Sequence, residues 1–85
     1  MACEEREGRL VVRGEVPIEE VEALVSALDA LRARQDESRP IPVDLGECIH
    51  MHTAGIQAML ERNVEVMSWP PESDWTHWLR AGFER

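Results

Sequence analysis

The sequence contains no lysine, and arginine supplies all nine of its basic residues. This absence excludes a P-loop lysine, a Schiff-base lysine and a lysine general base. No glycine-rich run that would cradle a phosphate group is present either. Seventeen acidic residues bring the net charge to −8. This excess argues against binding to nucleic acid or to an anionic membrane surface, since both require basic patches.

Cysteine is scarce, and long apolar runs are missing. Cys3 and Cys48 do not make a disulfide framework, and we expect two reduced thiols in a cytoplasmic protein. No run approaches the roughly 20 apolar residues of a membrane span. The acidic start of the chain lacks the apolar core of a secretory signal. The 85 residues predict a single domain, 1–85, with a thin core that a weak homodimer or a partner surface would help to stabilise.

The first half of the sequence predicts a hairpin, a long helix and a strand. Residues 3–7 and 10–14 indicate two strands around a Glu7-Gly8 turn, with the first strand at an edge. A helix opens at Pro17. One apolar stripe follows it at helical spacing: Ile18, Val21, Leu24, Val25, Leu28 and Leu31. After a polar loop over 36–40, a strand covers 41–45, and the intervening helix predicts that it is parallel to the second strand.

The second half predicts a short helix over 53–62, a fourth strand over 64–68 and a last helix capped by Ser73 or Asp74. Gly82 is placed to end this last helix in a left-handed turn, with Phe83 folding back on it. The predicted fold is therefore α/β, a four-stranded mixed β-sheet packed against about three α-helices.

Three tryptophans lie near the end of the chain. Trp75 and Trp78 are three residues apart on the predicted last helix, and we expect both to pack on the sheet. Trp69 precedes two prolines and is a candidate for an exposed anchor that contacts a partner.

The most informative stretch runs from Ile41 to Leu60, where a strand, a connector and the start of a helix at Thr53 follow one another. A hydroxyl at a helix start can cap the free N–H groups of the first turn. The same place favours a phosphate, because the free N–H groups and the helix dipole both attract negative charge. Thr53 is thus either a phospho-acceptor or a plain N-cap.

Val43-Asp44-Leu45-Gly46 and His52-Thr53-Ala54-Gly55-Ile56 together resemble the motif of STAS domains, the fold of bacterial anti-sigma factor antagonists. Members of that family carry a strand of the form L-D-L-S, a connector, and D-S/T-x-G-hydrophobic at a helix start. Thr53 falls on the position that is phosphorylated in the regulated members. His52 stands where those members have aspartate, and a neutral imidazole can still accept a hydrogen bond there.

The resemblance implies a STAS-like domain without enzymatic activity that regulates transcription or signalling by binding a protein. The partner would be an anti-sigma factor with serine kinase activity, released when Thr53 is phosphorylated, or an ABC-transporter ATPase subunit. No cofactor, nucleic acid or membrane insertion is expected. The resemblance places the docking surface on the connector and the first turn of the second helix: His50, His52, Thr53, Gly55, Ile56 and Gln57.

The alternative function is a metal-binding or metal-sensing module built on Cys48, His50 and His52. Residues at alternate positions of an extended segment point to one side, and thiolate and imidazole are good ligands for zinc or copper. No fourth ligand lies nearby. The STAS alignment instead makes Cys48 a small buried residue and His50 a packed one. A Cys–His nucleophile pair lacks an oxyanion loop. Asp44 is expected to face an edge or to cap a neighbouring turn.

Overall fold

The computed structural model describes residues 1–36 and 38–83, so Glu37 of the predicted 36–40 loop lies outside the described residues. Within them the chain forms five strands and three α-helices: β1 (Ala2–Arg6), β2 (Arg9–Val16), α1 (Val21–Ala33), β3 (Ile41–Asp44), β4 (Cys48–Met51), α2 (Thr53–Leu60), β5 (Val64–Ser68) and α3 (Asp74–Phe83). The predicted α/β class is confirmed, in the form of one mixed sheet with helices against it.

The sheet begins with an antiparallel hairpin of β1 and β2. Glu7 and Gly8 connect the two strands with φ angles of 52° and 83°. Two residues with positive φ match the twist of the flanking strands. The strand order is β1-β2-β3-β5, with β3 parallel to β2 and β5 parallel to β3. Both the edge position of β1 and the parallel pairing of β2 with β3 agree with the sequence-based prediction.

The prediction of four strands is wrong by one, because the predicted connector contains β4. Leu10 and Val11 of β2 pair with β3, whereas residues from Gly14 to Val16 pair with β4. The eight-residue strand β2 is long enough to hold both short strands end to end. The turn between them is closed by Asp44, whose carboxylate accepts a hydrogen bond from the N–H of Gly46 at 2.9 Å. Asp44 therefore caps a turn, one of the two roles expected for it.

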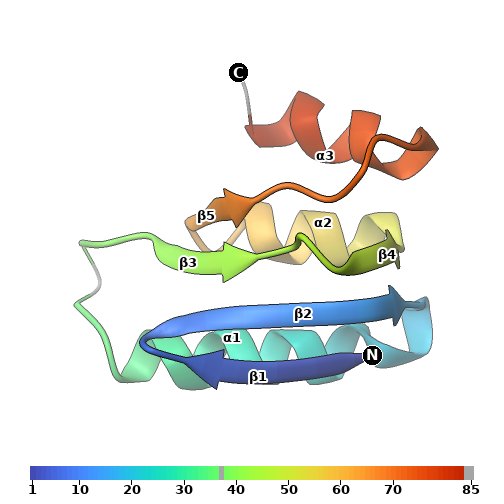
Figure 1. Ribbon diagram of the computed structural model, residues 1–85. Helices are drawn as coiled ribbons and strands as arrows, with labels where there is room; N and C mark the ends of the chain where they lie inside the picture. The colour runs from blue at the N-terminus through green and yellow to red at the C-terminus, as the bar shows by residue number, and fades with distance from the viewer. Residues whose placement is uncertain (37, 84–85) are drawn as a thin grey trace.

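Helices α1 and α2 lie side by side behind the sheet in the view of Figure 1, and α3 lies next to α2 beyond β5. The apolar stripe of α1 buries Leu24, Leu28 and Leu31 in the core between helices and sheet. Ile18 was assigned to the same stripe but is 55% exposed. It lies in a 3-10 turn, Ile18–Glu20, whose three residues per turn place it off the α-helical stripe. No helix in the ranges 1–36 and 38–83 combines the length and apolarity that crossing a bilayer requires.

The guanidinium of Arg32, near the end of α1, connects the two turns that lead into β3 and β5. It donates hydrogen bonds to the carbonyl oxygens of Arg39 at 2.6 Å and Arg62 at 2.8 Å, with longer contacts to those of Asp36 and Asn63. The planar fork of arginine can serve several acceptors at once. One side chain thereby fixes the entry of both strands relative to α1.

Helix α3 continues through Gly82 to Phe83, so the predicted left-handed turn at Gly82 is wrong. The glycine is needed for another reason. A Cβ atom at Gly82 would lie 2.9 Å from Cδ1 of Leu60, the last residue of α2. The missing side chain lets α3 approach the end of α2 closely.

Candidate functional site

Helix α2 begins directly after β4, and its first residue, Thr53, is exposed. The N-cap is His52, which has extended backbone angles and whose Nδ1 accepts a hydrogen bond from the N–H of Ala54 at 3.0 Å. This bond needs a neutral imidazole with its proton on Nε2. His52 therefore performs the capping that was considered for Thr53. In the part of the chain that the structure describes, the Thr53 hydroxyl makes no hydrogen bond.

Two of the six candidate docking residues lie in the buried layer beneath this helix start. Gly55 is buried, and a Cβ there would lie 2.8 Å from Cγ of Met51 and 3.5 Å from Cδ2 of Leu24. Ile56 is 4% exposed. These two residues hold the first turn of α2 against the end of β4. The exposed positions are His50, Thr53 and Gln57, and His52 is half-buried.

Two hollows flank Thr53, and we call the area that contains them the α2–α3 surface. The first has a volume of about 290 Å³ and is lined by His50, Met51, His52, Thr53, Asp74, Trp75 and Trp78. The second has a volume of about 250 Å³ and is lined by Thr53, Ile56, Gln57, Leu60, Trp78, Ala81 and Gly82. Thr53 and Trp78 line both hollows. All the candidate docking residues except Gly55 line at least one of them.

Trp78 is 67% exposed, so the expectation that it packs on the sheet is wrong. The buried residues of α3 are Trp75, Thr76 and Leu79. At 100° per residue, Trp78 lies roughly 100° around the helix from the centre of that stripe. Its ring consequently stands between the two hollows, and the predicted docking surface included neither Trp78 nor Asp74.

The other two tryptophans are less exposed than Trp78. Trp75 is buried, as predicted, and its indole N–H donates to the carbonyl oxygen of Ile49 at 2.9 Å. The ring of His50 meets that of Trp75 edge-on, with the two centroids 6.1 Å apart. Trp69 is half-buried, and the guanidinium of Arg80 lies 4.6 Å from its ring centroid. Trp69 is therefore not an exposed anchor, the role for which its position before two prolines made it a candidate.

Cys48, His50 and His52 do not point to one side as expected. Cys48 is 1% exposed, and burial raises the pKa of its thiol to about 11, whereas His50 is exposed. The register of β4 shifts opposite Gly14 and Glu15, and such a bulge breaks the alternation of side chains along a strand. Among residues 1–36 and 38–83, no three His, Cys, Asp or Glu side chains form a group that could hold a metal ion.

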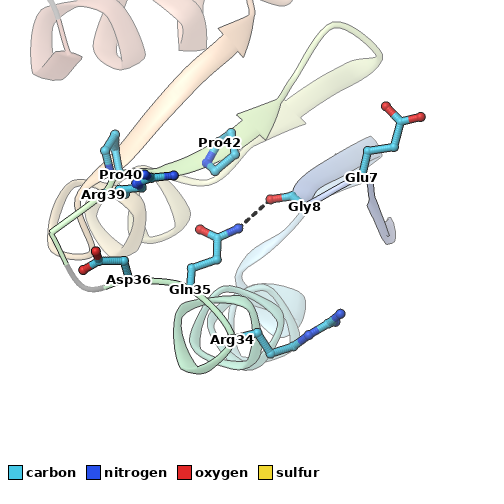
Figure 2. A pocket seen from close by; sticks show the side chains of 8 residues that line it. All are labelled: Glu7, Gly8, Arg34, Gln35, Asp36, Arg39, Pro40 and Pro42. Carbon is cyan, nitrogen blue, oxygen red and sulfur yellow. Dashed lines mark hydrogen bonds between the residues drawn. The ribbon is translucent and has the colours of Figure 1, made fainter.

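A third hollow, about 440 Å³ in volume, lies at another place, between the β1–β2 turn and the loop before β3 (Figure 2). The side chains of Glu7 and Arg34 point outward from it (Figure 2). Gln35 reaches toward β2 and donates from Nε2 to the carbonyl oxygen of Gly8 at 2.6 Å. The amide is thus occupied in holding the hairpin turn against the end of α1. None of the candidate docking residues lines this hollow.

The charges around the α2–α3 surface are few. Asp74 is the one carboxylate among the described lining residues, and no arginine lines either hollow. An exposed indole, an exposed hydroxyl and two hollows side by side form a surface suited to contact with another molecule. No protein-family model, curated protein or solved structure matches this chain.

Proposed function

We propose that this chain is a STAS-like regulatory module, without enzymatic activity, that binds a partner protein in the bacterial cytoplasm through the α2–α3 surface. The motif around Thr53 and the order β-β-α-β-β-α-β-α along a mixed sheet support this proposal. The observation that carries it is the place of Thr53. Its exposed side chain lies between two hollows lined by the residues that the motif selects for docking.

In the proposed scheme the unmodified protein captures an anti-sigma factor with serine kinase activity, as anti-sigma factor antagonists do. Phosphorylation of Thr53 releases the partner. A phosphoryl group adds about −1.5 to −2 charges. It would stand at the mouth of both hollows, beside the apolar side chains of Ile56, Leu60 and Trp78. A partner covering that place would have to strip the water from the phosphate, which weakens the complex.

Capture of the partner from a lysate of the source cells tests the proposal. Immobilised wild-type protein and Thr53→Ala should retain a kinase-like ATP-binding protein, identified by mass spectrometry, and Thr53→Glu should retain much less. Ser26→Glu is the matched control, because Ser26 is an exposed hydroxyl on α1 and the charge change is the same. Equal capture by Thr53→Glu would remove the phosphorylation switch and leave docking in place.

The identity of the captured protein decides between the two partner classes. Recovery of an ABC-transporter ATPase subunit in place of a kinase would assign the protein to transport. Trp78→Asp places a charge between the hollows without disturbing the core, since Trp78 is exposed. Capture that survives Trp78→Asp and Gln57→Asp together would show that the partner binds elsewhere, and the docking proposal would fail.

A further inference from the structure

We infer that the 290 Å³ hollow beside Trp78 and Asp74 receives an arginine or lysine side chain of the protein partner. This inference rests on the proposed docking function and names the chemistry of one contact within it.

The geometry of α3 brings an exposed ring and a carboxylate to the same place. Asp74 and Trp78 are four residues apart on the helix, which makes their side chains neighbours on its surface. Both are exposed, and both line the hollow. A cation is attracted to the face of an indole ring within about 6 Å of its centroid. A cationic side chain entering the hollow would therefore meet the ring of Trp78 on one side and the carboxylate of Asp74 on another. These two contacts have to outweigh the positive ends of α2 and α3, which begin at Thr53 and Asp74.

The protein already contains one contact of this chemical type. The guanidinium of Arg80 lies 4.6 Å from the ring centroid of Trp69, within the range for cation–π attraction. Trp75 cannot offer the same contact to a partner, because it is buried and its N–H is bonded to Ile49. Trp78 is the tryptophan whose ring stays exposed.

The distribution of charge favours a basic partner over a second copy of this chain. The net charge is −8, so two copies repel each other, whereas a partner with a basic surface is attracted. The arginines that form ion pairs do so away from the hollow, as Arg13 does with Glu4 and Glu47, and Arg34 with Glu5.

Two histidines and Thr53 share this hollow with Asp74. A phosphoryl group on Thr53 would attract a cation in this hollow. Release of the partner after phosphorylation therefore rests on the cost of desolvating the phosphate beside Ile56 and Leu60, and not on this contact.

A small-molecule titration tests the inference without the partner. N-acetyl-arginine methylamide is added to ¹⁵N-labelled protein at pH 8, and the three indole N–H resonances are followed by NMR. The matched probe is N-acetyl-citrulline methylamide, which has nearly the same shape without the charge. The Trp78 resonance should shift saturably with the arginine probe and much less with the citrulline probe. The Trp69 resonance, from a tryptophan that does not line the hollow, should stay in place.

Two variants separate a local contact from an effect of net charge. Asp74→Asn should weaken binding of the arginine probe by roughly two- to fivefold, the range for one exposed ion pair. Glu19→Gln, at an exposed position outside the lining of the hollow, makes the same charge change and should leave binding unaltered. Equal shifts with both probes, no saturable shift, or equal weakening in both variants would overturn the inference.

The two proposals can fail separately. If the arginine probe does not bind but the partner is still captured through the α2–α3 surface, only the cation contact is refuted. If the arginine probe binds at Trp78 but substitutions on the α2–α3 surface leave partner capture unchanged, the docking function is refuted.

Discussion

Removal of the imidazole at His52 should destabilise the whole domain, because this side chain caps α2. His52 Nδ1 accepts the N–H of Ala54 at 3.0 Å, and the helix it caps has only eight residues. Helices this short do not form alone in water and depend on packing and end effects. Replacing a capping side chain by alanine costs about 1 kcal/mol, within a range of roughly 0.5–2. His52→Ala should therefore lower the free energy of unfolding by about that amount.

The effect should be measurable in both chemical and thermal unfolding. In urea the midpoint should fall with the slope unchanged, since the surface exposed on unfolding stays the same. In a domain of this size, 1 kcal/mol corresponds to a fall in Tm of about 4–8 °C.

Two variants test whether the cap is the cause. His52→Asn keeps an acceptor at the N-cap, so it should retain most of the wild-type stability. Thr53→Ala removes an exposed hydroxyl that caps nothing, so its effect should stay within about 0.5 kcal/mol. A His52→Ala protein as stable as the wild type, or a larger loss in Thr53→Ala than in His52→Ala, would refute the assignment of the cap.

Three further changes have expected outcomes. Arg32→Lys should destabilise by about 1–3 kcal/mol in urea unfolding, because an ammonium cannot serve the carbonyls of both turns; a wild-type midpoint would contradict this. Gly55→Ala should destabilise the domain by about 1–3 kcal/mol, although alanine has a higher helix propensity than glycine. The reason is that Met51 leaves no room for a Cβ atom at this position. Unchanged stability would show that the Met51 side chain moves freely. Burial raises the pKa of the Cys48 thiol from 9.0 to about 11, so the unfolded chain loses this proton first and stability should fall as pH rises through that window. Cys48→Ala should make stability fall less steeply with pH. The chain has no lysine or tyrosine, so neither residue type titrates in this pH range. An unaltered slope of stability against pH would refute the assignment.

The parts of the fold that the sequence predicted are those encoded by neighbouring residues. The Glu7-Gly8 turn, the apolar stripe of α1 and the start of α2 all follow from local patterns. Strand β4 was missed because its evidence is not local. Its residues Cys48–Met51 are buried only at the two ends, so they show no alternation. What makes them a strand is the length of β2, whose distal half would otherwise lack a partner on that side.

The candidate surface was also predicted only in part, and the burial of Thr76 explains why. The motif located the part on α2, but the part on α3 depends on which side of that helix is buried. Their spacing of three residues made Trp75 and Trp78 the apparent buried pair, whereas the structure buries Thr76 in place of Trp78. The hydroxyl of Thr76 donates to the carbonyl oxygen of Ser73 and accepts the N–H of Ser73, both at 2.8 Å. With its polar group satisfied within its own turn, Thr76 can be 1% exposed at little cost. The buried stripe of α3 then runs from Trp75 through Thr76 to Leu79, and the rotation that this requires turns Trp78 outward between the two hollows.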